Sequence, residues 1–391
     1  MRIAISGAGV AGPTLAYWLT RAGHEATLIE VAPQLRTGGY VIDFWGLGYE
    51  VGCRMGLEQT IQDRGYHVRS IRSVTRRGRT RANLSTSGFR RATGGRFSSL
   101  PRGDLASAVY STIDGEVETV FGDSITAITE HEAGVRIDFR HGRTREFELA
   151  VGADGLHSTV RRLAFDRAGA AEHYLGCLVA AAVVDGYRPR DDLVYVTYSA
   201  PGHSVGRFAL RDDRTLLLFV FRCDRPNVPD HHQDRLAVLQ REFLGLGWEC
   251  PAMIDALRGV DDLYFDAVSQ VRLDRWWRGR TALVGDAAAS ISLLGGEGTG
   301  LAMTEAYVLA GELRTHSDHR QAFEAYQARL GPFIAAKQAG ARRALSTFAP
   351  KTALSLVFRD AAMRVMATVP GADRLLTRSL SDDLELPDYP M

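Results

Sequence analysis

The chain has 391 residues, with 47 Lys and Arg against 46 Asp and Glu and a formal net charge of +1. This near-neutral balance argues against a nucleic-acid-binding surface, and the length is enough for two domains. Four scattered cysteines form neither a C-x-x-C pair nor a metal-ligand spacing, so we expect reduced thiols and no metal site. We also expect a cytoplasmic protein without a signal peptide or membrane span, because the first residues already read as a strand and no apolar run approaches ~20 residues.

The first thirty residues read as strand, glycine turn, helix, strand and acidic tip. A buried strand over 3–6 runs into Gly7, Gly9 and Gly12, a helix follows, and a second strand over 27–29 ends at Glu30. Gly7 allows the tight turn, Gly9 lets the backbone approach a pyrophosphate, and Gly12 lets the helix pack on the strand. Glu30 is placed to accept hydrogen bonds from a ribose. We predict a dinucleotide-binding unit; the alternative is a glycine-rich turn that binds no nucleotide.

The next segment contains ionisable groups beside a glycine pair. Arg36 and Asp43 flank Gly38-Gly39 and a β-branched run, which indicates a backbone that passes close to something flat. Residues 46–48 resemble a second glycine fingerprint, but the next glycine comes one position late, so we treat them as a decoy and predict a helix over 50–57.

Arginine is then concentrated over residues 72–97, where we expect a solvated hairpin face rather than a nucleic-acid stripe, because aromatic residues do not interleave. Arg102 opens a helix and can reach a phosphate bidentately, although a surface ion pair is the alternative.

Alternating strands are predicted over 117–121, 125–130 and 135–139, as an inserted β-meander. An apolar strand then runs into Asp154-Gly155, and Ser158 is placed to cap the helix that follows. Alone, this Asp-Gly pair is merely a turn.

A second, mostly antiparallel sheet is predicted over 178–273, with strands at 194–198, 205–210 and 215–221 and a helix over 236–244. It is a candidate wall of an apolar pocket, although aromatic residues in strands are more often simple core. The candidate lining residues are Tyr195, Tyr198, Phe208, Phe219 and Phe221.

A buried strand over 280–284 ends at Gly285-Asp286, and a turn with Gly296 and Gly298 leads into a helix over 301–312. Such turns at helix N-termini suit an electron-rich group, and their separation in sequence indicates one long cofactor lying across the sheet. Helices are then predicted over 320–330, 332–346 and 351–366.

Together these motifs resemble the single-component FAD-dependent monooxygenases of the para-hydroxybenzoate hydroxylase type, most closely their tetracycline-inactivating and polyketide-tailoring branch. The resemblance implies an α/β fold: a Rossmann-type FAD-binding domain (1–177 and 274–330), an inserted, mostly antiparallel substrate domain (178–273) and a long C-terminal helical segment (331–391). The implied cofactor-binding residues, the last two from the turn that normally lies under the flavin ring, are Gly7, Gly9, Gly12, Glu30, Arg36, Asp43, Arg102, Asp154, Gly285, Asp286, Gly296 and Gly298.

The resemblance also implies the chemistry. NADPH would reduce a tightly but non-covalently bound FAD, and O2 would then give a flavin C4a-hydroperoxide that transfers one oxygen atom to an aromatic or polyketide-like substrate. Either hydroxylation or Baeyer–Villiger insertion fits. No individual catalytic side chain is identified, since the cofactor carries the redox step. We expect a monomer or a weak homodimer.

The chain departs from the family pattern in one segment. Ser292 and Leu293 stand where prolines are frequent, and Glu297 replaces the usual Gln. Alternatives therefore stay open: a flavin-dependent halogenase or reductase on the same fold, or a non-catalytic flavin-binding, drug-sequestering protein. The pair Trp276-Trp277 does not match the W-x-W-x-I-P signature of halogenases.

Overall fold

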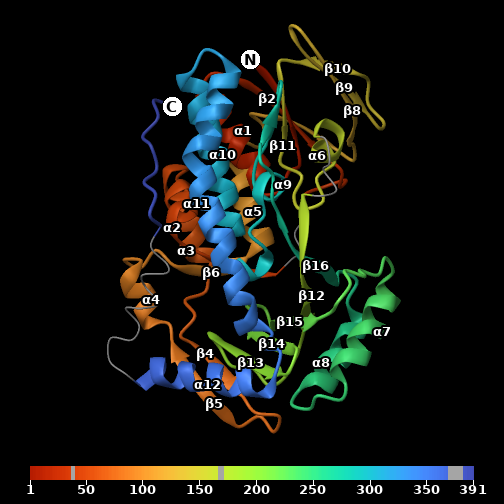
Figure 1. Ribbon diagram of the computed structural model, residues 1–391, viewed down its shortest axis with the longest axis vertical. Coiled ribbons are helices and arrows are strands. Elements are labelled where there is room, and N and C mark those ends of the chain that lie inside the picture. Colours follow the sequence, from red (N-terminus) through yellow and green to blue (C-terminus); the bar gives the residue numbers. More distant parts are fainter. Residues whose placement is uncertain (37–39, 166–170, 369–381) are drawn as a thin grey trace.

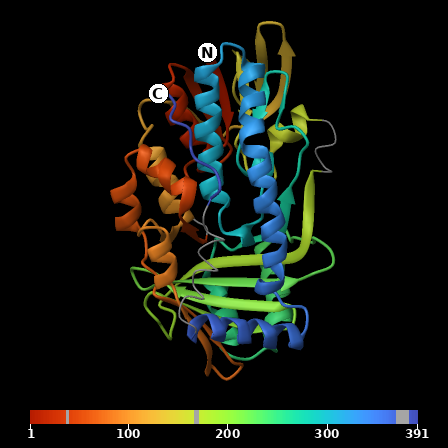
Figure 2. The same cartoon turned by 60° about the vertical axis from the view of Figure 1, so that its left-hand side comes forward.

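The computed structural model describes residues 1–36, 40–165, 171–368 and 382–391. Figure 1 shows two bodies stacked along the long axis. One holds a sheet flanked by helices together with both chain termini, and the other holds a second sheet with its own helices. Helix α11 runs from one body to the other (Figures 1 and 2). The predicted α/β fold with a long C-terminal helix is confirmed.

The first sheet has six strands in the order β17-β18-β11-β1-β2-β7, and only the β17–β18 pair is antiparallel. Because β1, β11 and β18 are parallel neighbours, the turns that follow them meet at one edge of the sheet. The bounds are β1 (Arg2–Ser6), β2 (Glu25–Glu30), β7 (Glu118–Phe121), β11 (Leu149–Gly152), β17 (Trp277–Arg278) and β18 (Thr281–Leu283).

The predicted meander is only partly right. Its first strand, β7, pairs in parallel with β2 and extends the main sheet. The remaining strands form a separate antiparallel sheet with β10, and a further two-stranded sheet joins β3 to β6. Hydrophobic alternation cannot distinguish these pairings, because it reports which face is buried and not which strand lies alongside. The bounds are β8 (Ile125–His131), β9 (Gly134–Phe139), β10 (Arg145–Phe147), β3 (Val41–Phe44) and β6 (Ser98–Pro101).

The core of the first body lies between its main sheet and two central helices, α1 and α10, which pack on each other. Helix α10 is buried around most of its circumference, and its mainly apolar sequence includes the buried Thr304, Glu305 and Glu312. The helices of this body are α1 (Ala11–Arg21), α2 (Gly46–Arg54), α3 (Glu58–Arg64), α4 (Ser87–Ala92), α5 (Arg102–Ser111), α6 (Thr159–Ala164), α9 (Asp286–Ala289), η3 (Leu293–Gly295) and α10 (Gly298–Thr315).

Helix α2 begins at Gly46, four residues before the predicted start at Glu50. The backbone N–H of Leu47 donates to Asp382 Oδ2 at 2.9 Å. A carboxylate from the far end of the chain thus caps this helix, a contact that no local pattern reveals. The residues treated as a decoy fingerprint are therefore the first turn of a helix.

The second sheet has seven strands in the order β16-β12-β15-β14-β13-β4-β5, all antiparallel except β13 with β4. Strands β4 and β5 come from the arginine-rich hairpin, outside the expected range 178–273, and β12 begins before it. The hairpin is thus part of this sheet. The bounds are β4 (Ser70–Val74), β5 (Thr80–Ser85), β12 (Glu172–Asp185), β13 (Val194–Ala200), β14 (His203–Ala209), β15 (Arg214–Arg222) and β16 (Tyr264–Val271).

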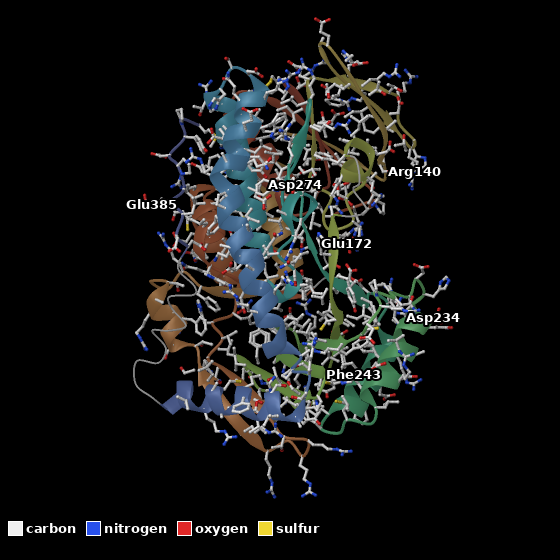
Figure 3. The ribbon with its side chains drawn as sticks, in the orientation of Figure 1. Arg140, Glu172, Asp234, Phe243, Asp274 and Glu385 are labelled. Atoms are coloured by element: carbon white, nitrogen blue, oxygen red, sulfur yellow. The ribbon has the colours of Figure 1, made fainter. Side chains whose placement is uncertain are left out.

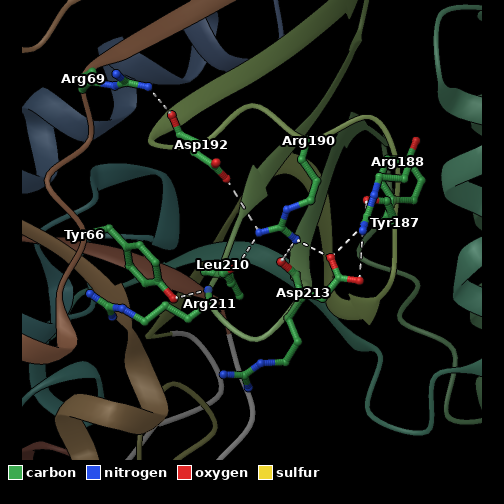
Figure 4. Close-up of polar contacts among 10 residues, drawn as sticks. Tyr66, Arg69, Tyr187, Arg188, Arg190, Asp192, Leu210, Arg211 and Asp213 are labelled. Carbon is green, nitrogen blue, oxygen red and sulfur yellow. Dashed lines mark hydrogen bonds and ion pairs between the residues drawn. The ribbon is translucent and has the colours of Figure 1, made fainter.

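One face of this sheet packs on helices α7 (His232–Phe243), α8 (Cys250–Ala256) and η2 (Leu257–Gly259). The predicted helix over 236–244 thus begins four residues early. The hairpin between β14 and β15 turns at Asp212 and Asp213, whose φ angles of 56° and 57° are left-handed. Arg188 pairs with Asp213 at 2.8 Å, and the hydroxyl of Tyr66 accepts the N–H of Arg211 at 2.8 Å (Figure 4). The Tyr66 contact thereby ties this hairpin to the segment that follows α3.

An ionic cluster holds the two bodies together at β12. His157 Nε2 lies 3.2 Å from Asp266 Oδ1, and its Nδ1 lies 3.4 Å from Glu172 Oε2. Figure 3 shows Glu172 on the strand that leaves the first body. Hydrogen bonds to the two carboxylates raise the pKa of His157 to about 10, so this contact stays ionic at neutral pH.

Helix α11 (His319–Phe348) is a single helix, whereas a break was predicted at Pro332. The proline is exposed, and so is Ala328, the residue whose carbonyl loses its i+4 donor. Water can therefore solvate that carbonyl, and the helix continues. Helix α12 (Ala353–Thr368) packs on β5, and residues 382–391 return along the first body. Among the helices described, none has the length and apolarity to cross a bilayer.

Candidate active site

The first glycine turn is shaped by packing at two positions and is open at the third. A Cβ at Gly7, where φ is +105°, would lie 2.5 Å from the Ala153 carbonyl oxygen, and one at Gly12 would lie 1.9 Å from the Gly7 oxygen. A Cβ at Gly9 would have nothing within 4 Å. No side chain caps the first turn of α1. Backbone N–H groups and free space thus coincide at Gly9, as a phosphate requires.

Glu30, at the tip of β2, ties this turn to the neighbouring strand. Its Oε2 accepts the N–H of Ala8 at 2.8 Å and its Oε1 accepts the N–H of Ala32 at 2.9 Å. Arg36 is exposed and lies 3.8 Å from Oε1. The nearby predicted pair Gly38-Gly39 lies outside the described residues. Glu30 therefore orders the turn as well as standing where a ribose is expected.

The Asp154 carboxylate is engaged locally. It accepts the Ser158 hydroxyl at 2.5 Å and the N–H of Thr159 at 2.7 Å, and Ser158 in turn accepts the N–H of Arg161 at 3.0 Å. The predicted Ser158 cap is confirmed. The buried guanidinium of Arg161 donates to the carbonyls of Leu156 at 2.5 Å and Ala287 at 3.0 Å. Arg161 thus joins two of the turns, a role that sequence reasoning did not assign.

The turn after β18 has a strained backbone and is supported by a buried side chain of α10. Gly285 has φ +63° and ψ −144°, a region reserved for glycine, and its N–H donates to Glu305 Oε2 at 2.7 Å. Glu305 is 1% exposed, and burial raises its pKa well above the ordinary value. The hydroxyl of Tyr326 lies 3.1 Å from the same oxygen. Sequence reasoning missed this support because Glu305 lies within an apolar helical run.

Asp286 follows this turn, and the nearby Arg102 attracts its carboxylate. Across the described residues, no side chain or backbone group hydrogen-bonds or ion-pairs with it. A Cβ at Gly298 would lie 3.7 Å from Asp286 Oδ1, so the third glycine turn lies beside it. The turn contains Gly296, with φ +73°. Three turns that are distant in sequence thus come together in space.

Four further side chains lie deep in the molecule and are still partly accessible: Tyr40, Asp43, Arg102 and Tyr264. The Arg102 guanidinium faces Tyr40 and Asp286, and in the described part of the chain nothing hydrogen-bonds to it. Asp43 accepts the hydroxyl of Ser99, and burial raises the pKa of the Asp43 carboxyl. Arg102 and Asp286 thus attract each other without a direct hydrogen bond, beside the rings of Tyr40 and Tyr264.

The five aromatic residues expected to line a pocket divide between the two faces of the second sheet. Tyr198, Phe219 and Phe221 pack into the core under α7 and α8, so for them the lining hypothesis is wrong. Tyr195 and Phe208 face the first body and stack 4.3 Å apart. Phe208 is fully buried, which leaves Tyr195 as the candidate with partial exposure. Strand alternation explains the division.

A cavity of about 520 Å³ lies elsewhere, at the outer side of α2. None of the predicted cofactor residues lines it, so it is distinct from the site at the glycine turns. Its lining residues are Trp45, Gly46, Leu47, Glu50, Arg54, Ala92, Thr93, Arg96, Asp382, Leu384, Glu385 and Leu386.

Known proteins share this arrangement. The family model of the FAD binding domain matches residues 1–336. The chain belongs to this family. A flavin-dependent monooxygenase from an unknown prokaryotic organism is 33% identical over 343 residues, which cover 86% of this chain and 88% of the relative. Among solved structures, tetracycline destructase Tet(55) is 30% identical with a TM-score of 0.85, and it covers 99% of this chain and 98% of its own. Tetracycline destructase Tet(51) is 27% identical, with a TM-score of 0.84 and 99% of both chains covered.

Membership of the FAD-binding family identifies an FAD-dependent oxidoreductase of the monooxygenase class and confirms the resemblance described from the motifs. The residues present fit FAD. Gly9 leaves room for the pyrophosphate beside an uncapped helix, and Asp286 offers a carboxylate without a partner. Arg102 offers a cation on the same side.

Proposed function

We propose that the protein is an NADPH-dependent monooxygenase that holds FAD across the three turns and inserts one oxygen atom of O2 into an aromatic or polyketide-like molecule. The meeting of the turns after β1, β11 and β18, with the Asp286 and Arg102 side chains beside them and without hydrogen bonds in the described residues, carries this proposal. The reaction balances as substrate, O2, NADPH and a proton giving oxygenated substrate, water and NADP⁺. Hydroxylation and Baeyer–Villiger insertion both satisfy this balance.

FAD would supply hydride acceptance and oxygen activation. The chain's own groups would bind and orient it. The N–H groups around Gly9 would hold the pyrophosphate, Glu30 a ribose, and Asp286 the ribityl hydroxyls. Backbone N–H groups between Gly296 and Gly298 would polarise the edge of the flavin ring. Arg36, Arg102, Asp43 and Asp154 complete the proposed set.

Aromatic side chains near these turns support the proposed substrate class. Tyr40 and Tyr264 lie with ring centroids 5.5 Å apart, and Tyr195 is stacked on Phe208 in the same cluster. Flat aromatic faces suit a planar, multi-ring molecule, since stacked rings gain beyond the area that they bury. The similarity to two tetracycline destructases supports the same class, and a tetracycline is therefore included in the test.

The test combines two rates with a product analysis. Purified protein is mixed with NADPH, and flavin bleaching and O2 uptake are followed with phenols, aromatic polyketides and a tetracycline. We expect one compound to accelerate bleaching, to consume O2 in proportion to NADPH, and to gain one oxygen atom by mass. A yellow protein that no compound activates supports a flavin-binding or sequestering role, and turnover that requires halide supports a halogenase; either result overturns the proposal.

A further inference from the structure

The end of the chain is anchored on the first body. The ring of Tyr389 occupies the space above Gly311, where a Cβ would come within 2.1 Å of it. Its hydroxyl donates to Glu312 Oε1 at 2.6 Å, and the carbonyl of Pro387 accepts the hydroxyl of Tyr307 at 2.8 Å. Residues 382–391, which we call the tail, therefore dock on α10 through specific contacts. Figure 3 shows Glu385 on this tail at the outer edge of the molecule.

The inner end of the tail reaches the third glycine turn through one lysine. Lys337 Nζ, on α11, lies 2.7 Å from Asp382 Oδ1 and 2.8 Å from Glu297 Oε2. The three side chains are only 12–16% exposed. Asp382 also accepts the N–H of Leu47 with its second oxygen. One ammonium thus joins the tail, α11 and the turn.

The charges of this triad do not balance without the lysine. Burial raises the pKa of Glu297, and the hydrogen bond from Lys337 opposes that shift. Asp382 raises the pKa of Glu297 further, so these two carboxylates repel each other. Removing a charge from a nearly dry cluster costs more than forming the cluster gains, because the remaining charges lose their compensation. The triad is therefore sensitive to the loss of its only cation.

The position of the turn depends on the same residues. Glu297 is the N-cap of α10 and lies between Gly296 and Gly298. Gly48 of α2 packs so closely that a Cβ there would lie 2.1 Å from the Gly300 Cα. Asp382 holds the start of α2, and Lys337 holds Glu297, so both sides of this contact are tied to one ammonium.

We propose that Lys337 is a positioning residue that couples the docked tail to the cofactor turn and fixes Gly296–Gly298 against the flavin. The inference rests on the proposed binding of FAD at this turn. It gives a function to Glu297, the residue that departs from the family pattern. Through its ion pair with Lys337, the Glu297 carboxylate connects the turn to α11 and to the tail.

The experiment is a thermodynamic cycle on FAD binding. Apoproteins of the wild type, Lys337→Met, Glu297→Gln and the double variant are titrated with FAD, and the dissociation constant and the visible flavin spectrum are recorded. We expect Lys337→Met to weaken binding at least about tenfold and to shift the spectrum. The double variant should differ from Glu297→Gln by less than Lys337→Met differs from the wild type, because the neutral amide leaves only Asp382 without its cation. Asp382→Asn should likewise partly rescue Lys337→Met.

Arg329→Met is the matched control. Arg329 also lies on α11 and pairs with an α10 carboxylate that the tail contacts, Glu312, at 3.0 Å. It lies two turns of α11 before Lys337, away from the glycine turn. We expect it to lower the thermal midpoint without changing FAD affinity or the flavin spectrum.

The outcomes separate the two proposals. Unchanged FAD affinity in Lys337→Met, equal effects of Lys337→Met and Arg329→Met, or no rescue by Glu297→Gln contradicts the positioning role while leaving the proposed function intact. A wild-type apoprotein that takes up no FAD contradicts the proposed function, and this inference with it.

Discussion

Replacing Glu305 tests the support beneath the Gly285 turn. Glu305→Ala leaves the Gly285 N–H, now paired at 2.7 Å, without an acceptor in a fully buried place. An unsatisfied buried donor costs about 1–3 kcal/mol, and the space left by the side chain adds about 2 kcal/mol. We expect a loss of about 3–5 kcal/mol, or roughly 4–6 °C in the thermal midpoint of the apoprotein, since ~2.1 cal/mol/K per residue gives about 0.8 kcal/mol/K for 391 residues. Glu305→Gln keeps the acceptor and the volume, so it should stay within about 1 kcal/mol of the wild type at pH 4.

The pH dependence of stability, compared between the wild type and Glu305→Gln, is a more specific test. Burial raises the pKa of Glu305 well above its ordinary 4.5, so the folded state keeps a proton that the unfolded state releases. The stability that this proton contributes is complete below pH 4.5 and is lost as pH rises toward the folded pKa, by up to about 1.4 kcal/mol per pH unit. Glu305→Gln lacks this slope. Its thermal midpoint should therefore rise relative to the wild type between pH 4.5 and 7, and parallel profiles would refute the reasoning.

Three further predictions address the turns. Gly9→Ala should leave the thermal midpoint of the apoprotein unchanged but weaken FAD binding, because its Cβ meets no protein atom within 4 Å. Gly12→Ala should lower both the thermal midpoint and the FAD affinity, since its Cβ would lie 1.9 Å from the Gly7 oxygen. Differential scanning calorimetry and FAD titration check the two variants. Asp286→Asn should lower FAD retention on gel filtration without lowering stability, and unchanged flavin content would remove Asp286 from the site. Ser158→Ala removes the cap of α6 and should cost about 1 kcal/mol in urea unfolding; equal midpoints would contradict the cap.

The glycine turns were predictable because their signals are local. A strand, a glycine spacing and a helix start lie within a dozen residues, and the backbone conformations required at Gly7 and Gly285 leave few other residue types. Features that depend on distant partners were not predictable. Asp382 caps α2 across 335 residues, which moves the helix start to Gly46. The strand β7 joins the main sheet, and Pro332 lies at an exposed position, where water can take the place of its missing donor.

The candidate site shows the same division. Most residues predicted from the sequence stand at the turns themselves, whereas the residues that were missed contact the turns from neighbouring helices. Arg161 joins two turns, Glu305 supports Gly285, and Lys337 holds Glu297. Each is ionisable, at least partly buried, and hydrogen-bonded or ion-paired to a turn at least 20 residues away in the sequence. Burying an ionisable group costs free energy unless a partner compensates it. The partner of such a group therefore indicates which part of the structure the group stabilises. In this chain the partners of all three residues lie at the glycine turns. The residues that support the turns and the residues at the turns therefore belong to one site.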